Sequence, residues 1–249
     1  MYNYYMLEKD ERMDDLQLKG LKIIQNRNQF CFGTDAVLVS HFSNAKKHSS
    51  IIDLGTGNGI IPLLLYGKFE VERIAGIEIQ EEAFLLAKRN VQLNNLEDRI
   101  SLVNGDIKDI HKYFPIGSFD HVISNPPYIK KGTGIINAKD NLAYARHEIL
   151  CDLEDILKAT RYLLNFKGSF TMVHRPDRLN DILYLMKKHY IEPKRIRFVH
   201  SNEKSGANLV LIQGLKDMNP FLTVEKPLII HRADGSYTDE IFEIYGRER

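Results

Sequence analysis

Residues 50–59 read SIIDLGTGNG, an apolar stretch that ends on an acidic residue and runs into a glycine-rich turn. Ile51 and Ile52 are β-branched, which is typical of a buried strand. Glycines permit a positive φ and let a ligand approach the main chain closely. The apolar pattern that begins at Ile60 predicts a helix after the turn. A strand, a glycine turn and a helix in this order indicate a ligand-binding loop of an α/β fold.

The spacing of the glycines narrows the ligand. They follow the pattern GxGxG, so the third glycine comes one residue early for the GxGxxG turn that binds a pyrophosphate. Asp53, directly before the turn, would also repel a pyrophosphate but suits a ligand with a cationic amino end. We therefore predict that the loop binds S-adenosylmethionine (SAM). The cofactor-binding residues expected here are Asp53, Gly55, Thr56, Gly57, Asn58 and Gly59.

From residue 50 onward, apolar runs alternate with helical patterns. This alternation predicts a largely parallel sheet covered on both faces. We expect one doubly wound, Rossmann-like α/β domain with a seven-stranded, mostly parallel sheet, and an appendage formed by the Pro-rich stretch from Asn219 and by Tyr237–Tyr245. The expected strands are Ile51–Leu54, Ile74–Ile79, Ile100–Val103, His121–Ser124, Ser169–Val173, Arg195–His200 and Asn208–Gln213, and the expected helices are Ile60–Tyr66, Gln80–Asn94 and Asp152–Leu164.

The residues before this alternation predict a short hairpin and one helix. Leu21–Gln25 and Gln29–Phe32 are expected to pair as strands around a polar turn. Thr34 is expected to cap a helix over Asp35–Phe42. We expect residues 1–45 to pack on a methyltransferase domain that comprises residues 46–249.

Two further acidic residues end predicted strands. Glu78 lies about 20 residues beyond the turn, where doubly wound folds place a carboxylate that accepts hydrogen bonds from ribose hydroxyls. Asp106 follows the next strand and is positioned to accept a bond from the cofactor's adenine amino group. Ligands bind at the carboxyl ends of parallel strands, so acids at three consecutive strand ends predict one cofactor site. Ile79 and Ile107 adjoin two of these acids and are included in it.

The tetrapeptide Asn125-Pro126-Pro127-Tyr128 follows the fourth strand. Two prolines fix φ and remove two N–H donors, so this turn is rigid and extended. A conjugated exocyclic amine is a poor nucleophile. The Asn125 side-chain oxygen and the Pro126 carbonyl can accept its two N–H bonds and turn its lone pair toward a methyl group. Tyr128 offers a flat face, worth about 1–3 kcal/mol for a stacked base. Together the four residues are the candidate catalytic group; Asn125 is also expected to contact the cofactor and Tyr128 to bind the substrate. The pattern alone does not choose adenine over glutamine.

The bulk composition excludes several classes of protein. The chain has 249 residues, 43% of them hydrophobic, and a net charge of +1. Its apolar runs are shorter than the roughly 18 residues that span a bilayer, and its acidic N-terminal stretch does not resemble a secretory signal. Cys31 and Cys151 are far apart and have no histidine partner at metal spacing, so we expect reduced thiols, no metal and a cytoplasmic protein. The oligomeric state is left open, and a monomer is compatible with the sequence.

The order DxGxG, acidic strand end, GD and NPPY resembles the class I SAM-dependent amino-methyltransferases, whose seven-stranded sheet has an antiparallel last strand. The flanks resemble the bacterial tRNA1(Val) adenine-37 N6-methyltransferases. The similar stretches are residues 21–42 (LKIIQNRNQFCFGTDAVLVSHF), residues 145–148 (ARHE) and residues 227–246 (PLIIHRADGSYTDEIFEIYG). This resemblance implies SAM as cofactor and an unpaired adenine as substrate, at position 37 in the anticodon loop of a valine tRNA.

Three alternatives share these motifs. NPPY is also found in protein-glutamine N5-methyltransferases of release factors, which carry a separate N-terminal helical domain, and in ribosomal RNA guanine-N2 methyltransferases. An alternative of another class is a catalytically silent SAM-binding RNA module, against which the intact NPPY argues. The chain has no recognition domain of the size that DNA methylases use. Its substrate must therefore present the base by shape, as an RNA loop does.

Basic residues near NPPY are candidates for contacting the RNA backbone. Phosphate contacts from Lys130, Lys131 and Arg146 would position RNA without reading its sequence. His147 is interpreted as a structural residue, because the reaction needs no general base. The family pattern gives Thr34 a second role, lining the cofactor pocket. A later basic cluster is interpreted as a solvated face, and it comprises Lys187, Lys188, His189, Lys194, Arg195 and Arg197.

Overall fold

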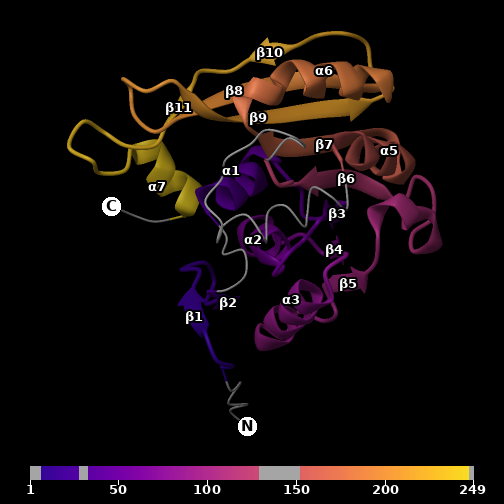
Figure 1. Cartoon of the computed structure of the whole chain (residues 1–249), viewed down its shortest axis with the longest axis vertical. Helices are drawn as coiled ribbons and strands as arrows, with labels where there is room; N and C mark the ends of the chain where they lie inside the picture. The colour runs from indigo at the N-terminus through magenta and orange to yellow at the C-terminus, as the bar shows by residue number, and fades with distance from the viewer. Residues whose placement is uncertain (1–6, 28–32, 129–151, 247–249) are drawn as a thin grey trace, which may run out of the picture.

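The computed structural model describes residues 7–27, 33–128 and 152–246 (Figure 1). Its central sheet has the strand order β5-β4-β3-β6-β7-β9-β8. β9 runs antiparallel to both of its neighbours, and the other adjacent pairs run parallel. These seven strands confirm the predicted doubly wound, mostly parallel sheet. Their bounds are β3 Ser50–Leu54, β4 Arg73–Glu78, β5 Ile100–Asn104, β6 Phe119–Ser124, β7 Leu164–His174, β8 Ile191–His200 and β9 Ala207–Lys216.

Two short strands that were not predicted extend this sheet to nine strands. β10 (Thr223–Val224) and β11 (Leu228–Ile229) both pair in parallel with β8, the outermost of the seven. An uncovered edge strand would leave a row of N–H and C=O groups open to pairing with another chain. The Pro-rich tail therefore covers the β8 edge, and this pairing explains why these residues are extended.

Helices cover both faces of the sheet, and an apolar cluster lies between the sheet and the helices on each face. Side chains alternate between the faces of a strand, so Ile51 packs in the cluster formed with α1, α2 and α7, and Ile52 in the cluster formed with α5 and α6. α6 was not predicted, although Ile182 and Met186, one helical turn apart, are fully buried. The helices are α1 Thr34–Phe42, α2 Ile60–Phe69, α3 Glu81–Leu93, α5 Leu153–Leu163, α6 Leu179–Lys188 and α7 Asp239–Tyr245, with 3-10 turns η1 Ile107–Lys112 and η2 Pro176–Arg178.

The N-terminal hairpin contains a partner strand that was not predicted. β2 (Lys22–Asn26) pairs antiparallel with β1 (Glu11–Asp15), which was missed, and the expected strand Gln29–Phe32 lies outside the described residues. β1 reads ERMDD and lacks the apolar alternation that predicts a strand. The Arg89 guanidinium holds it on α3 through two hydrogen bonds to Glu11, of 2.6 and 2.9 Å.

The predicted cap of the first helix is wrong by one residue. α1 starts at Thr34, and its N-cap is Gly33, which has extended backbone and makes no side-chain cap bond. Thr34 is therefore the first helical residue. Its hydroxyl lies 3.4 Å from the Tyr245 hydroxyl at the end of α7, which ties the C-terminal appendage to the start of α1.

Two asparagines on α3 attach the hairpin to the core. Asn90 is fully buried, accepts a hydrogen bond from Ile24 N (2.6 Å) and donates to Ile24 O (3.0 Å) and Asn58 O (2.9 Å). One turn later, Asn94 makes the same pair of bonds to Lys22 N (2.9 Å) and Lys22 O (2.7 Å), in a more exposed position. Lys22 and Ile24, alternate residues of β2, thus make with these two side chains the backbone hydrogen bonds that a neighbouring strand would otherwise provide.

Replacing Asn90 with alanine is expected to lower the free energy of unfolding by about 3 kcal/mol, because it leaves buried backbone groups of Ile24 and Asn58 without partners. Asn94→Ala is the matched control, and its exposed partners regain water, so we expect a loss of about 1 kcal/mol. Urea unfolding monitored by circular dichroism measures both. Equal losses in the two variants would contradict the assignment of Asn90 as the buried attachment point.

Candidate active site

The carboxyl ends of four parallel strands bring most of the predicted site residues to one edge of the sheet (Figure 1). Asp53 is the next-to-last residue of β3 and Glu78 is the last residue of β4, while Asp106 and Asn125 follow the ends of β5 and β6. The order β5-β4-β3-β6 makes these ends neighbours in space. The three acids and the NPPY turn therefore lie at neighbouring strand ends on one edge of the sheet.

The glycine turn adopts the left-handed backbone that its sequence predicts. Gly55, Gly57 and Gly59 have φ values of 75°, 54° and 82°, which only glycine adopts without strain. The amides of Gly55 and Thr56 both donate to the Ile77 carbonyl at 3.0 Å, which folds the turn back onto β4. Gly59 is the N-cap of α2, and a Cβ there would lie 3.3 Å from the Ala87 Cβ. The loop is thus packed against its neighbouring elements.

Glu78 holds this turn through both of its carboxylate oxygens. The side chain is buried, Oε2 accepts from the Gly57 amide at 2.9 Å, and Oε1 accepts from the Gln80 amide at 2.9 Å. A carboxylate has about four lone-pair sites, so each oxygen keeps acceptor capacity. Glu78 therefore shapes the loop and can still receive ligand hydroxyls.

Asp53 is fully buried, and neither of its carboxylate oxygens has a hydrogen-bond partner among the described residues. Burial raises the pKa of Asp53 to about 7; the nearby Thr56 hydroxyl opposes this rise without reaching hydrogen-bonding geometry, and the charge of Glu78 adds to it. Burying an unpaired carboxylate is costly unless a partner offsets the cost. The side chain therefore fits a ligand that brings a positive charge to this edge.

Other buried polar atoms beside Asp53 also lack partners within the described part of the chain. They are Thr56 Oγ1 and Asn58 Nδ2 in the glycine turn, and Gln80 Nε2 just after β4. Such atoms are rare in folded proteins unless a ligand or water pairs with them. Their concentration around one loop indicates a polar ligand that is held from several sides.

Asp106 and its neighbours form the outer part of the same edge. Its Oδ1 accepts from the Lys108 amide at 2.9 Å and so caps η1, and its Oδ2 lies 3.5 Å from Lys108 Nζ. Ile107, the residue after Asp106, is buried, and Ile79, the residue after β4, is partly buried. An acceptor with an apolar neighbour in the chain is a combination that suits a heteroaromatic ring.

The NPPY turn is fixed at both ends. The Ser124 hydroxyl donates to the Leu54 carbonyl at 2.9 Å, which locks the end of β6 to β3. The Tyr128 hydroxyl lies 2.7 Å from Asn125 Oδ1 and 2.8 Å from Asp35 Oδ2. The Tyr128 ring also meets the His174 ring edge-on, with centroids 5.3 Å apart. The position of this tyrosine is thus set by residues from α1, β6 and β7.

His174 and Asp35 are site residues that the sequence did not indicate. Burial, reinforced by the charge of Arg178, lowers the pKa of His174 to about 4, so its ring is neutral at pH 7. His174 Nδ1 accepts from the Arg175 amide at 2.8 Å, which leaves the ring proton on Nε2. Asp35 precedes Tyr128 by 93 positions. No local pattern relates residues so far apart, and only the fold brings them together.

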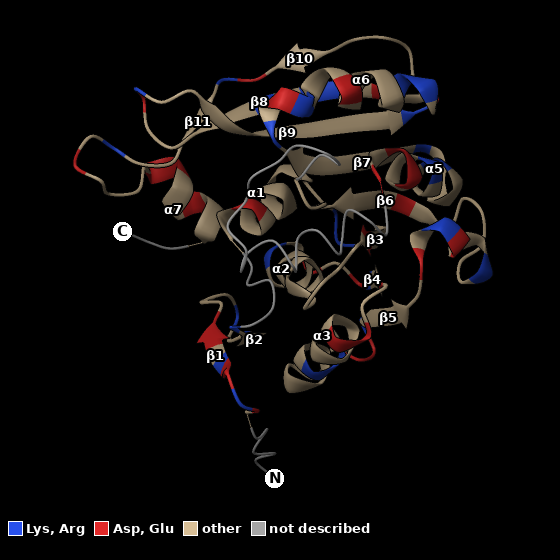
Figure 2. Cartoon of the chain, in the orientation of Figure 1, with Lys and Arg blue, Asp and Glu red and all other residues tan. Residues whose placement is uncertain are grey.

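Lys130, Lys131, Arg146 and His147 lie outside the described residues, so their predicted roles stay predictions. Five residues of the later basic cluster pair with acids, and Lys194 donates to the Asn219 carbonyl instead. Lys187 and Lys188 are exposed, as a solvated face predicts, whereas His189 and Arg197 are mostly covered. Figure 2 shows basic and acidic positions intermixed around α6 and β8. The pairs are Lys187 with Glu192, Lys188 and His189 with Glu154, Arg195 with Glu225, and Arg197 with Glu240.

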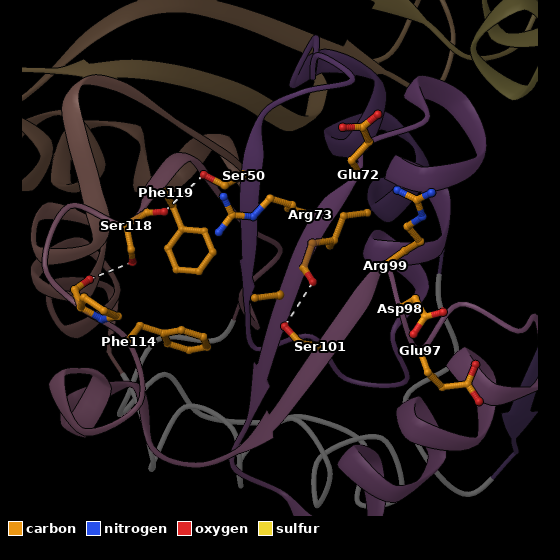
Figure 3. A pocket seen from close by; sticks show the side chains of 13 residues that line it. Ser50, Glu72, Arg73, Glu97, Asp98, Arg99, Ser101, Phe114, Ser118 and Phe119 are labelled. Carbon is orange, nitrogen blue, oxygen red and sulfur yellow. Dashed lines mark hydrogen bonds between the residues drawn. The ribbon is translucent and has the colours of Figure 1, made fainter.

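A hollow of about 390 Å³ lies at the opposite edge of the sheet (Figure 3). Ser50, Arg73 and Phe119, the first residues of β3, β4 and β6, line it. Ligands of doubly wound folds bind at the carboxyl ends of the strands, and this hollow is at the amino ends. We therefore locate the active site by the strand ends and the unpartnered polar atoms, and not by this hollow.

Across residues 7–27, 33–128 and 152–246, no three His, Cys, Asp or Glu side chains gather as a metal-binding group. Within the same residues, no helix is long and apolar enough to cross a membrane.

The strand order and the glycine turn define the class I SAM-dependent methyltransferase fold. A predicted O-methyltransferase from Agrobacterium tumefaciens shares it, with a TM-score of 0.70 and 21% identity over 85% of this chain and 95% of that one. A geranyl diphosphate C-methyltransferase from Streptomyces coelicolor, solved with S-adenosyl-L-homocysteine, has a TM-score of 0.51 and 12% identity over 71% of this chain and 79% of that one. Both likenesses concern the fold.

The family is defined by sequence as well. The model of the methyltransferase small domain matches residues 20–181, and the chain belongs to this family. A tRNA1(Val) (adenine(37)-N6)-methyltransferase of Porphyromonas gingivalis (strain ATCC 33277) is 30% identical over 239 residues, which cover 91% of each chain. The protein of the same name from Aliivibrio salmonicida is 27% identical over 208 residues, 84% of this chain and 86% of that one.

Proposed function

We propose that this protein is a SAM-dependent methyltransferase that methylates N6 of adenine 37 in tRNA1(Val). Relatives of that name match 84–91% of this chain and a similar share of their own length. The observation that carries the chemistry is the placement of Asn125 and Pro126 beside the edge that holds Asp53 and Glu78.

The cofactor side of the site follows from the acceptors at the strand ends. SAM, when bound, supplies the methyl group. Asp53 would hold its cationic amino end, because this carboxylate is buried and none of the described residues pairs with it. Glu78 would accept from the ribose hydroxyls with its remaining lone pairs, and Asp106 from the adenine amino group. Thr34, Ile79 and Ile107 would line the sides of the cofactor pocket. The glycine turn would contact the cofactor through its backbone, and its residues are Gly55, Thr56, Gly57, Asn58 and Gly59.

The substrate side depends on acceptors held in place before the reaction. Asn125 Oδ1 and the Pro126 carbonyl would each accept one N–H of the adenine amine. These bonds favour a pyramidal nitrogen whose lone pair faces the methyl group, and preorganised acceptors of this kind are a major source of catalysis. Pro127 keeps the turn rigid, and Tyr128 would stack on the base. The methylated nitrogen is acidic and releases its proton afterwards, so no general base is required.

The RNA must be held from outside this turn. Lys130, Lys131 and Arg146 are proposed to contact phosphates, which positions the loop without reading its sequence. An unpaired base costs least to turn into a pocket, and position 37 adjoins the anticodon. The expected partners are therefore SAM and a tRNA.

The decisive experiment uses labelled SAM and purified tRNA from a strain that lacks the gene. Label in N6-methyladenosine at position 37 of tRNA1(Val), with none in tRNA from the parent strain, is the expected result. Label in a release factor or in ribosomal guanine, with none in tRNA, would instead assign the glutamine or guanine reaction. SAM binding without transfer to any of these acceptors would indicate a silent SAM-binding module.

The affinity for SAM is expected to rise about tenfold between pH 5.5 and pH 7.0. The pKa of Asp53 lies above the 3.8 of an ordinary aspartate, at about 7. Its negative form, which would pair with the amino end of SAM, therefore increases throughout this window. The window ends at pH 7.0 because an α-amino group begins to lose its own proton above it.

By the same linkage, the apoprotein should lose stability as the pH rises from about 4 to about 7, since the folded Asp53 keeps a proton that the unfolded chain releases.

Isothermal titration calorimetry at several pH values measures the pH dependence of the affinity for SAM. Asp53→Asn should bind SAM weakly with an affinity that no longer changes across the window. An Asp53→Asn variant with the wild-type pH profile would show that another group titrates.

A further inference from the structure

The Tyr128 hydroxyl faces two oxygens but has a single proton. Asp35 Oδ2 lies 2.8 Å from it and Asn125 Oδ1 lies 2.7 Å from it. An ionised aspartate can only accept hydrogen bonds. A charged acceptor also binds a hydroxyl more strongly than an amide oxygen does. The Tyr128 proton therefore belongs to Asp35, and two lone-pair-bearing oxygens would remain face to face on the Asn125 side.

The asparagine can remove this conflict by turning its amide. The carbonyl and amino arms of an amide have nearly the same shape, so their hydrogen-bond partners decide which arm faces which neighbour. If the amino arm of Asn125 faces Tyr128, Nδ2 donates to the phenol oxygen and the phenol donates to Asp35. All three groups are then satisfied, and Asn125 Oδ1 is directed away from Tyr128.

We propose that Asp35 is a positioning residue that acts through Tyr128 to keep the carbonyl arm of Asn125 available to the acceptor amine of the substrate. The inference rests on the proposed function, in which Asn125 Oδ1 must accept an N–H bond. Asp35 is assigned no direct contact with substrate or cofactor in that function. Its site is prepared by α1, where Oδ1 of the same side chain accepts from the Ala36 amide at 2.9 Å. One carboxylate thus joins the start of α1 to the reactive turn.

Loss of the carboxylate would have a specific consequence. In Asp35→Ala, Asn125 Oδ1 is the other acceptor that the described residues offer the phenol, so the proton moves to it. That oxygen then competes with the substrate amine, although the position of the turn hardly changes. Removing the phenol as well, in Asp35→Ala/Tyr128→Phe, takes away the competing donor. A second mutation that restores activity is a result that a purely structural role of Asp35 does not produce.

Steady-state methylation of unmodified tRNA1(Val) tests this order of activities. Asp35→Ala should lower kcat about 10- to 100-fold, less than the roughly 100- to 1000-fold that follows the loss of a preorganised group in direct contact with the reacting atoms. Tyr128→Phe should lower it less than about tenfold, and the double variant should match Tyr128→Phe rather than Asp35→Ala. Asp35→Asn keeps an acceptor and should lose only about threefold. Asp239→Ala, a first-turn carboxylate of α7, is the control and should have wild-type activity.

Binding measurements separate positioning from misfolding. The KM for tRNA and the Kd for SAM should stay within about twofold of wild type in Asp35→Ala, because the change concerns one hydrogen bond. A double variant that is less active than Asp35→Ala would overturn the proposal, as would a wild-type kcat in Asp35→Ala.

A measurement without substrate keeps the inference separate from the proposed function. In the ¹⁵N-labelled protein, the Asn125 side-chain amide, assigned by its loss in Asn125→Ala, should exchange its protons slowly. Fast exchange is expected in Tyr128→Phe and in Asp35→Ala. If the wild type methylates no tRNA, the proposed function fails, but the exchange rates still test whether Asp35 orients the Asn125 amide through Tyr128. An Asn125 amide that exchanges equally in all variants would refute it.

Discussion

Asn125→Ala is expected to lower kcat for tRNA methylation at least about 1000-fold, the largest effect of any substitution in the protein. The alanine removes the side-chain acceptor that would pyramidalise the substrate amine, and the Pro126 carbonyl alone cannot direct the lone pair. Affinity for SAM should change less than about threefold, because the cofactor contacts come mainly from the β3, β4 and β5 ends. Initial rates with labelled SAM, together with calorimetric titration of SAM, measure the two quantities.

The matched control is Asn165→Ala. Asn165 is partly exposed at the opposite edge of the sheet, where Nδ2 donates to Asp120. This variant should keep wild-type kcat and SAM affinity. An Asn125→Ala protein that retains more than a tenth of the wild-type kcat would remove the side-chain amide from the mechanism.

Glu78→Ala is expected to weaken SAM binding about 100-fold or more. It removes two charge-assisted hydrogen bonds, worth about 1.5–3 kcal/mol each, that hold the glycine turn at Gly57 and the chain at Gln80. It also removes the acceptor proposed for the ribose hydroxyls. Calorimetric titration gives the Kd, and thermal unfolding of the apoprotein gives the contribution of the loop bonds alone.

Two variants calibrate this effect. Glu78→Gln has a single oxygen and must fail one of the two amides, so its Kd should fall between wild type and Glu78→Ala. Glu82→Ala removes an exposed carboxylate at the start of α3 and should bind SAM normally. If Glu78→Gln binds SAM as well as the wild type, the two amide bonds do not shape the site.

The sequence predicted those parts of the fold that are determined locally. The strand at Ser50–Leu54 and the turn after it are encoded by consecutive apolar residues and by glycines with positive φ. Glu78 and Asp106 were predicted because an acid directly at the end of an apolar run is visible in the sequence, and parallel pairing brings such ends together. The same reasoning predicted the NPPY turn.

What was missed depends on contacts between distant residues. β1 has the composition of a loop and is a strand because β2 pairs with it and Arg89 binds Glu11. β10 and β11 are extended because they lie along β8. The contact of Asp35 with Tyr128 joins positions 93 apart. No periodicity reports such pairs, since each partner is ordinary in its own segment.

The attachment of the hairpin has a dynamic consequence. Asn90 Nδ2 donates both to Ile24 O in the hairpin and to Asn58 O in the glycine turn. Detachment of the hairpin therefore disturbs the turn, and a ligand that orders the turn must slow that local opening. We therefore expect the Ile24 amide, which lies outside the cofactor site, to exchange its hydrogen more slowly when the cofactor is bound.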